Sequence, residues 1–360
     1  MTYAEPDPDR RAQTDPSCPT GRPSGEVHID EWVAPDACDD TGFLRPGKIL
    51  EWMDVVGALA ATRYVRAPVV TASVDGLELS RRIGIGERVT MRARVVHTGH
   101  RSIGVAVEMV SGGRPALSAF MTFAVVGADG HASPVPRFRP ETPEEMTRHR
   151  EGEARARFRR ELAGGRAAPR STLAPVAPAV AAAGEPGLVL FLRDLGQRLT
   201  GRRRGDADVR SPDVSYVHKI EPVRSGKLNF HGTLYGGTLM RWLETCAAMS
   251  ATAFLSAPPR LVAVDGLAFL RPVAPNVFVH LDAIAVHSDA DGVTVMVRAV
   301  SEDPLATTSA HTLRGFFTYA PVDPSVAIPA LARGGADDEL FCEVVLRQQL
   351  RRRIAEQRAR

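Results

Sequence analysis

Residues 42–54 read Gly-Phe-Leu-Arg-Pro-Gly-Lys-Ile-Leu-Glu-Trp-Met-Asp, and residues 232–244 read Gly-Thr-Leu-Tyr-Gly-Gly-Thr-Leu-Met-Arg-Trp-Leu-Glu. The two stretches share two glycines, a tryptophan and a final carboxylate, at a constant spacing of 190 residues. At the same spacing, Val74-Asp75-Gly76-Leu77 recurs as Val264-Asp265-Gly266-Leu267. Further along, the second copy has six extra residues, and beyond them Met121-Thr122-Phe123 aligns with Phe317-Thr318-Tyr319. Self-similarity of this kind marks one folding unit that is used twice. We therefore expect two copies that pack on each other as the subunits of a symmetric dimer would.

The bulk composition indicates a soluble globular protein. The 360 residues are enough for about two ordinary domains and their connectors. Hydrophobic residues make up 44% and charged residues 24%, and the net charge of +3 gives no bulk signal for nucleic-acid binding. Arginines gather locally at 202–204 and 351–353. The favoured interpretation of these runs is a solvated face, and contact with the phosphates of a nucleotide-bearing substrate is the alternative.

The cysteines and the amino terminus predict the compartment. Cys18, Cys38, Cys246 and Cys342 lack the spacing of a metal site, so we expect free thiols and no bound metal. The amino terminus is acidic and proline-rich, unlike a signal peptide, and no apolar run approaches the length that spans a bilayer. These features predict a cytoplasmic protein without a membrane span.

Composition and hydrophobic spacing divide the chain into five parts. We expect a disordered tail at 1–26, a first domain with a trailing charged helix at 27–162, a linker at 163–212 that could hold a short helix at Leu188–Leu199, a second domain at 213–325, and a helix with a basic tail at 326–360. Each domain has one predicted helix, near 46–64 or 236–255, followed by about four β-branched, alternating strands. This order predicts an α+β fold in which antiparallel sheets wrap long helices.

Each copy has a glycine-bearing loop that runs directly into its helix, from Gly42 to Gly47 and from Gly232 to Gly237. Glycines let the backbone approach a ligand closely, and the first amides of a helix are unpaired and partly positive. Such a terminus suits a carbonyl oxygen that becomes negative when its carbon is attacked. The alternative is a tight loop-to-helix turn with no further role.

A carboxylate follows each loop at the same place in the helix. Asp54 follows Gly47 by seven residues and Glu244 follows Gly237 by seven, each within an apolar stretch. A carboxylate in apolar surroundings is costly unless it is paired or catalytic. It could act as a base towards water or attack a carbonyl carbon itself. A carboxylate that simply faces solvent is the alternative, which the repetition in both copies disfavours.

Other repeated or polar positions carry weaker signals. The context of Asp75 and Asp265 favours a structural role, and His97 and His287 are interpreted as packing or strand-end residues. The turn that contains Arg101 and Ser102 could contact a substrate phosphate, although a plain turn is favoured.

These residues resemble the tandem, double-hotdog acyl-CoA thioesterases. The second copy's Asn229-x-His231-Gly232-x-x-Tyr235-Gly236-Gly237, with the helix that follows, is similar to the family's Asn-x-x-Gly-x-x-Phe-Gly-Gly loop. The first copy's Gly47-x-x-Leu50-x-Trp52-Met53-Asp54 looks like the paired pattern of the first domain. The resemblance implies a double hotdog that hydrolyses the thioester of an acyl-CoA without a cofactor. It also implies that each site combines the carboxylate of one copy with the loop of the other.

Carried over by position, the resemblance implies one competent site and one degenerate site. In the competent site Asp54 is the catalytic carboxylate, and Thr233 and Gly237 complete the catalytic set. Substrate contacts fall on the loop residues Asn229, His231, Gly232 and Gly236. Thr233 stands where the family's usual loop asparagine is expected. In the degenerate site Glu244 faces the first-copy loop with Gly47, where Phe43 takes the polar position and cannot orient water.

Two alternatives stay open on the sequence. One is a thioesterase whose acyl group is carried by a carrier protein, and the other is a double hotdog that binds acyl-CoA without cleaving it. A dehydratase is disfavoured because His231 precedes the glycine loop rather than following the carboxylate. The family likeness further favours a homo-oligomer, a trimer of double hotdogs.

Overall fold

The computed structural model describes residues 25–126, 133–163, 209–229, 231–332 and 338–359. Nearly all of the predicted amino-terminal tail, and most of the predicted linker with its helix at Leu188–Leu199, lie outside the described residues.

The two halves repeat one order of elements. The first half consists of β1 (Glu26–Trp32), a 3-10 turn (Pro35–Ala37), α1 (Pro46–Val65), β2 (Val69–Leu79), β3 (Arg88–Thr98), β4 (Ser102–Ser111), β5 (Arg114–Val125) and α2 (Pro143–Ala163). The second half consists of β6 (Val209–Arg210), two 3-10 turns (Pro212–Ser215 and Ser225–Lys227), β7 (Val217–Pro222), α5 (Gly236–Leu255), β8 (Pro259–Phe269), β9 (Phe278–Asp289), β10 (Gly292–Asp303), β11 (Thr308–Pro321), β12 (Ala330–Leu331) and α6 (Asp338–Ala359). One long helix and four long strands per copy agree with the spacing of the sequence.

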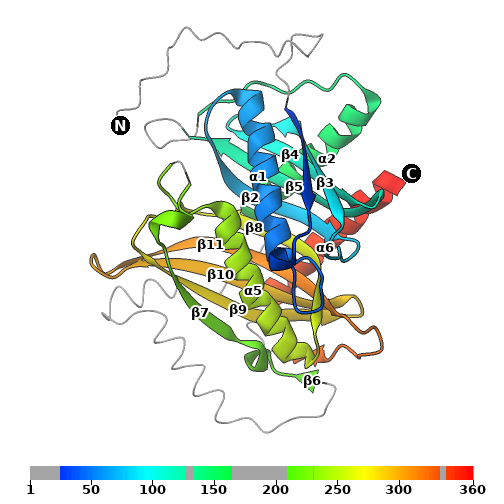
Figure 1. The fold of residues 1–360 in the computed structure, drawn as a ribbon, viewed down its shortest axis with the longest axis vertical. Helices are drawn as coiled ribbons and strands as arrows, with labels where there is room; N and C mark the ends of the chain where they lie inside the picture. The colour runs from blue at the N-terminus through cyan, green and yellow to red at the C-terminus, as the bar shows by residue number, and fades with distance from the viewer. Residues whose placement is uncertain (1–24, 127–132, 164–208, 230, 333–337, 360) are drawn as a thin grey trace.

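The two halves share one ten-stranded antiparallel sheet, in the order β1-β3-β4-β5-β2-β8-β11-β10-β9-β7 (Figure 1). The halves meet where β2 pairs with β8, with Val74 opposite Leu267 and Leu77 opposite Val264. Because Val74 and Val264 are equivalent positions, as are Leu77 and Leu267, this register is self-complementary, as at a two-fold axis. The double-hotdog prediction is therefore confirmed, with the two expected sheets joined edge to edge.

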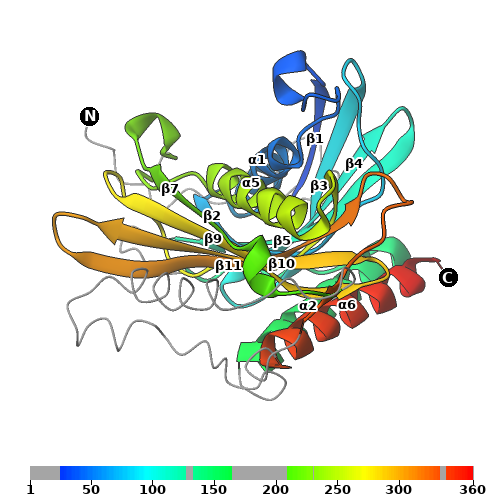
Figure 2. The same cartoon turned by 90° about the horizontal axis from the view of Figure 1, so that it is seen from below.

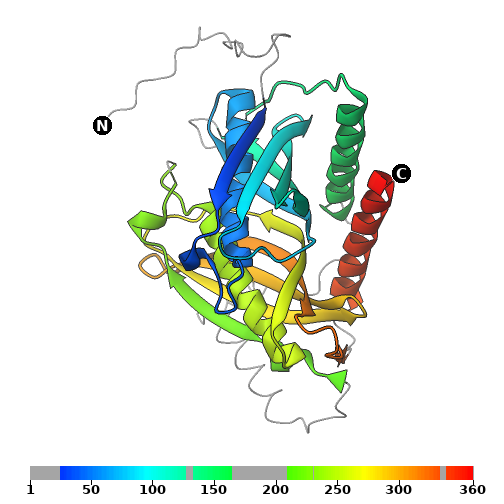
Figure 3. The same ribbon diagram turned by 45° about the vertical axis from the view of Figure 1, so that its right-hand side comes forward.

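The helices cover the sheet on both faces. The long helices α1 and α5 lie on one face, and α2 and α6 lie on the other (Figures 2 and 3). In α1 the buried side chains include Ile49, Leu50, Met53 and Val56, the apolar stripe that the sequence predicts. Within the described ranges, no helix combines the length and the apolarity that crossing a bilayer requires.

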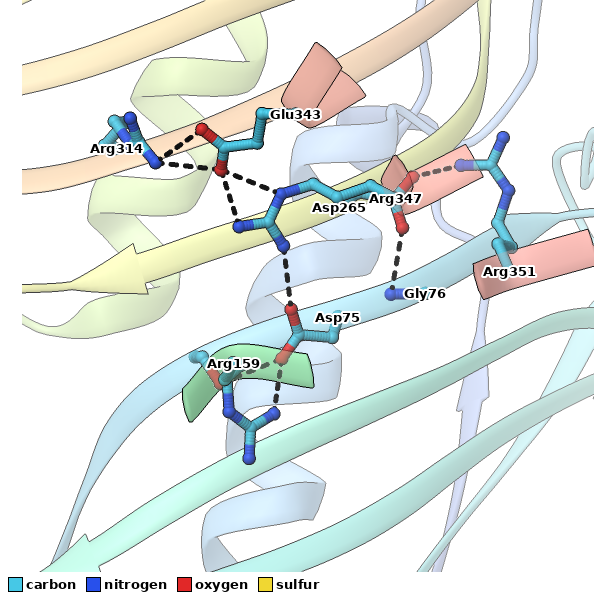
Figure 4. A network of polar contacts seen from close by, with 9 residues as sticks. Asp75, Gly76, Arg159, Asp265, Arg314, Glu343, Arg347 and Arg351 are labelled. Atoms are coloured by element: carbon cyan, nitrogen blue, oxygen red, sulfur yellow. Dashed lines mark hydrogen bonds and ion pairs between the residues drawn. The ribbon is translucent and has the colours of Figure 1, made fainter. Parts of the chain in front are cut away.

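Buried ion pairs join α2 and α6 to the central strands (Figure 4). Asp75 of β2 contacts Arg159 of α2 at 2.6 Å and Arg347 of α6 at 3.6 Å. Asp265 of β8 pairs with Arg351 of α6, and burial raises the pKa of this aspartate. Removal of one partner from such a buried pair leaves an uncompensated charge. Both aspartates therefore have structural roles on the face of the sheet opposite α1 and α5.

The helices α2 and α6 are themselves part of the repeat. Glu151, Arg155 and Arg159 of α2 return as Glu343, Arg347 and Arg351 of α6, 192 residues later. Arg155 pairs with Glu151 at 3.5 Å, and Arg347 pairs with Glu343 at 2.7 Å. The duplicated unit thus extends past the sheet to the helix that follows it.

At Gly57 the helix α1 lies close to side chains of β5. A Cβ atom at Gly57 would lie 2.9 Å from the ring of Phe123, which is fully buried. Alanine normally stabilises a helix interior by about 1 kcal/mol relative to glycine, whereas overpacking a core costs about 1–3 kcal/mol. We expect Gly57→Ala to lower the free energy of unfolding by up to about 2 kcal/mol in denaturant titration.

Gly226→Ala is the matched control, because a Cβ atom there meets nothing within 4 Å. Its effect should stay within about 0.5 kcal/mol. A gain in stability from Gly57→Ala would contradict the tight packing of α1 on β5.

Candidate active site

The amino-terminal halves of α1 and α5 lie side by side and antiparallel. Arg241 Nε contacts Glu51 Oε1 at 2.6 Å, and 51 and 241 are equivalent positions of the two copies. The pseudo-two-fold axis therefore passes between these two side chains. On either side of the axis, each helix starts next to the ninth residue of the other, which is Asp54 in α1 and Glu244 in α5.

Asp54 lies at the start of α5 and is only 2% exposed. The Gly237 backbone N–H donates to Asp54 Oδ2 at 2.7 Å, and the Thr71 hydroxyl donates to Oδ1 at 2.6 Å. The Tyr235 hydroxyl, which donates to the Glu51 backbone carbonyl at 3.5 Å, also lowers the pKa of this carboxylate. Since Gly237 is the second residue of α5, Asp54 accepts one of the amides that the helix leaves unpaired. Two predicted residues from opposite halves, Asp54 and Gly237, thus meet directly.

Burial dominates the electrostatics of Asp54. Desolvation raises the pKa of Asp54 from 3.8 to about 6, although hydrogen bonds from Thr71, Gly237 and Tyr235 oppose that rise. The positive end of the α5 dipole also favours the ionised form. Near neutral pH the group is a buried carboxylate that can take up a proton, as a general base requires.

A side chain at Gly236 would crowd the Asp54 carboxylate. A Cβ atom at Gly236 would lie 3.0 Å from Asp54 Oδ2 and 3.5 Å from Thr71 Oγ1. A side chain there would fill the space in front of the two groups. The glycine also leaves the first amides of α5 accessible to a small oxygen ligand.

The loop before α5 is shaped by Asn229. Its side-chain oxygen accepts from the backbone N–H of His231 at 2.9 Å and of Thr233 at 3.2 Å, and its amide donates to the Thr233 hydroxyl at 3.1 Å. Gly232 has a φ of +75°, which favours glycine. The loop therefore contains an asparagine four residues before Thr233, and the threonine hydroxyl is paired with it. That Thr233 orients water stays a prediction.

Arg101 and Ser102 lie elsewhere on the sheet. Arg101 is exposed in the turn between β3 and β4, and Ser102 begins β4. The strand β5 separates β4 from β2, which carries Thr71. A contact of this turn with substrate phosphates stays a prediction.

The second carboxylate, Glu244, has a similar environment. It is 6% exposed, accepts a hydrogen bond from the Gly47 backbone, and lies 3.2 Å from the Tyr319 hydroxyl oxygen. Burial raises the pKa of Glu244 from 4.5 to about 7. Pro46 and Leu261 stand where the Asp54 site has Gly236 and Thr71. Proline has no N–H and leucine no hydroxyl, so this site lacks two hydrogen-bond donors.

The first-copy loop is held by charged and aromatic contacts. Asp39, the counterpart of Asn229, accepts from the Phe43 backbone N–H at 3.1 Å. The Arg82 guanidinium pairs with Asp39 at 2.8 Å and lies 3.8 Å from the centroid of the Phe43 ring. Phe43 is thus fixed under an arginine and presents no polar group, as the sequence indicates.

Sequence reasoning missed the roles of Thr71, Tyr235 and Tyr319. Each of them is far in sequence from the carboxylate that it contacts. Thr71 lies 17 residues after Asp54, and Tyr319 lies 75 residues after Glu244. Tyr235 comes from the opposite half from Asp54. A comparison of the two copies could have found two of them, because Thr71 aligns with Leu261 and Tyr319 aligns with Phe123 in the repeat. A hydroxyl gained or lost at a buried, repeated position marks a place where the two sites differ.

Fold and site together define a double hotdog in which the start of each central helix lies against a buried carboxylate of the other. The family model of the thioesterase superfamily matches twice, at residues 41–117 and 231–307. A Bacillus subtilis protein named an uncharacterized acyl-CoA thioester hydrolase is 32% identical over 134 residues, which cover 36% of this chain and 78% of the relative. The chain belongs to the thioesterase superfamily.

Two longer matches cover both halves. The acetyl-coenzyme A thioesterase of Rattus norvegicus is 28% identical over 294 residues, 79% of this chain and 48% of the relative. The chain thus spans about half the length of the curated relatives that it first matches. The structure of a Lactobacillus plantarum protein described as an oleoyl thioesterase covers 86% of this chain and 97% of its own, with a TM-score of 0.51 and 12% identity. This last match bears on the fold alone.

The raised pKa of Asp54 predicts a pH-dependent cost to folding. The folded protein binds a proton at Asp54 more tightly than the unfolded chain does. The protonated carboxyl therefore adds to the free energy of unfolding, fully below about pH 3.8, and this addition is lost as the pH rises through about 6. We expect Asp54→Asn to stabilise the protein more at pH 8 than at pH 5, by about 1–2 kcal/mol in denaturant titrations.

Asp30→Asn is the matched control on the surface, where the hydrogen bond from Arg88 lowers the pKa of the aspartate. Its effect should be nearly the same at pH 5 and pH 8, because a pKa below 3.8 leaves Asp30 ionised at both values. Equal effects of Asp54→Asn at both pH values would show that the Asp54 carboxyl is not held in its protonated form by burial.

Proposed function

We propose that the protein is an acyl-CoA thioesterase, which hydrolyses the thioester to a free acid and CoA at one competent site per chain. The observation that carries this proposal is the contact across the seam between Asp54 of the first half and the Gly237 amide of the second. Membership of the thioesterase superfamily and the names of the relatives support the same reaction.

The proposed mechanism starts from the ionised Asp54. At pH values above its pKa of about 6, Asp54 is ionised and can react in one of two ways. It either takes a proton from a water molecule that attacks the carbonyl carbon, or attacks that carbon itself to form an acyl anhydride, which water then hydrolyses. In both routes the C–S bond breaks, CoA leaves as a thiol after protonation, and the acid keeps the oxygen from water. Thr71 and Tyr235 orient the carboxylate through their hydroxyls.

The start of α5 would stabilise the oxygen of the thioester. Gly236 and Gly237 are the first two residues of the helix, where backbone N–H groups point outward and the dipole is positive. Since the Gly237 N–H donates to Asp54, the Gly236 N–H is the donor that would hold the thioester oxygen. Charge develops on the carbonyl oxygen as its carbon becomes tetrahedral, so fixed amides there lower the barrier. Pro46 denies the second site one of these amides, which supports a single competent site.

Three further proposals rest on the sequence and the family likeness. Asn229, His231 and Gly232 shape the loop that would contact the substrate, and a trimer of double hotdogs is the proposed assembly. A cytoplasmic location stays a prediction.

Replacement of the two carboxylates tests the single-site proposal. Asp54→Asn removes the base or nucleophile, so thiol release from acyl-CoAs should fall by about 10²–10⁴-fold. Glu244→Gln should keep activity within about threefold, because the proposed chemistry does not use Glu244. Release is measured with a thiol reagent on short- and long-chain acyl-CoAs.

Equal losses in the two variants would overturn the single-site assignment. Binding of acyl-CoA without any thiol release by the native protein would instead favour a protein that binds acyl-CoA without cleaving it. A preference for acyl groups on a carrier protein would identify an acyl-carrier thioesterase, with the same hydrolysis reaction but another substrate.

Thr71 should act on the pH dependence of the rate. Its hydrogen bond lowers the pKa of Asp54, so Thr71→Val should raise that pKa and shift the acid limb of kcat/KM upward by about one unit. Leu261→Val, at the equivalent position of the second site, is the matched control and should leave the limb in place. An unmoved limb in Thr71→Val would exclude Asp54 as the titrating group.

A further inference from the structure

Glu51 of α1 contacts the start of α5 at three points. A Cβ atom at Gly237 would lie 3.0 Å from the Glu51 Cα atom, so the two backbones approach each other closely. The Tyr235 hydroxyl donates to the Glu51 backbone carbonyl at 3.5 Å, and Arg241 Nε donates to Glu51 Oε1 at 2.6 Å. Glu51 therefore contacts the residue before the helix, the first turn of the helix and its second turn.

These contacts surround the groups of the proposed chemistry. Asp54 follows Glu51 by three residues, nearly one turn of α1, so both side chains lie on the side of α5. Asp54 Oδ2 accepts from the Gly237 N–H at 2.7 Å, and the same glycine packs on Glu51. A shift of α5 away from Glu51 would lengthen the hydrogen bond to Asp54. It would also move the Gly236 N–H that is proposed to hold the thioester oxygen.

The contact between the Glu51 and Arg241 side chains can be removed without a change of backbone. The Glu51 side chain is 16% exposed and the Arg241 side chain is 44% exposed, so water and salt screen the pair only in part. The other carboxylate oxygen of Glu51 lies 3.3 Å from Lys48 Nζ within α1. One carboxylate thus has a cation on its own helix and a cation on the opposite helix. The contact with Arg241 is the one that joins the two halves.

The equivalent contacts at the second site are of another kind. A Cβ atom at Gly47 would lie 2.8 Å from Arg241 Cγ and 3.2 Å from Glu244 Oε2, so the start of α1 packs on the stem of the arginine. Arg45 stands where the Asp54 site has Tyr235, so the second site lacks that tyrosine hydroxyl. The full set of three contacts therefore belongs to the site with Asp54.

We propose that Glu51 is a positioning residue of the Asp54 site, and that its ion pair with Arg241 holds the start of α5 at the spacing that hydrolysis requires. The inference rests on the proposed thioesterase function and deepens it by naming the contact that aligns the two halves of the site. Glu51 does not touch the reacting atoms. It acts through Gly237, whose amide orients the Asp54 carboxylate. Alignment matters because a displacement of about 1 Å can lower a rate by about 100-fold.

The test is a double-mutant cycle measured by thiol release from butyryl-CoA and palmitoyl-CoA. Glu51→Gln and Arg241→Met should each lower kcat by about fivefold with KM nearly unchanged, the most that a partly exposed ion pair contributes. The double variant should lose no more than either single variant, because each removes the same ion pair. Arg241→Lys, which keeps the positive charge, should keep kcat within about twofold of the native value.

Lys48→Met is the matched control, because it removes the other cation of Glu51 without breaking a contact with α5. Its kcat should stay within about twofold of the native value. Hydrogen exchange gives a second readout that does not depend on turnover. The Gly237 amide, which is held by Asp54, should exchange about fivefold faster in Glu51→Gln and Arg241→Met and at the native rate in Lys48→Met.

The outcomes separate this inference from the proposed function. Native kcat in Glu51→Gln and Arg241→Met, losses that add in the double variant, or a loss that Arg241→Lys does not recover would overturn the inference while hydrolysis stands. A native protein that releases no thiol from any acyl-CoA would overturn the proposed function, and the inference with it. If Arg241→Met fails to fold, Glu51→Gln decides the question, because glutamine keeps the size and shape of the side chain.

Discussion

The structure depends on a reciprocal contact in which each central helix starts against a buried carboxylate of the other. Gly237 donates its amide to Asp54, and Gly47 donates its amide to Glu244. Each carboxylate loses hydration on burial, which raises its pKa, and gains an amide together with the positive end of a helix dipole. The two contacts tie the halves together at the same places where they create reactive groups. At Asp54, where we propose the chemistry, the burial that creates the reactive group also disfavours its ionised form.

Fusion of the two copies into one chain released a constraint that a homodimer obeys. On the axis of a symmetric dimer a side chain faces its own copy, so a glutamate would meet a glutamate. Here Glu51 meets Arg241 at that position, and the pair, partly exposed, contributes up to about 1 kcal/mol. The same freedom allowed the sites to diverge, since only one of them has a proline at the helix start. One chain thus keeps two similar scaffolds and can use them differently.

The opposite face of the sheet shows what did not diverge. The acidic and basic positions of α2 recur in α6, and both helices reach the aspartates of β2 and β8. On this face the aspartates of β2 and β8 pair with arginines, and these ion pairs join the two helices to the central strands. Because β2 also carries Thr71 on the side of α1, the register of β2 and β8 sets where that hydroxyl meets Asp54.

The sequence by itself determined the duplication, the long helices and the carboxylates, because these depend on spacing within one segment. The helix at 236–255 has the bounds that its apolar spacing predicts, and Asp54 is buried as its apolar neighbours indicate. The pairing of Asp54 with Gly237 followed from the family likeness, but only the tertiary structure placed Thr71 and Tyr235 beside Asp54, because they come from another strand and from the other half. The joining of the sheets at β2 and β8 likewise depends on pairing between distant segments, which no local pattern encodes. The raised pKa values follow from that assembly, since burial is a property of the packed protein and not of the chain.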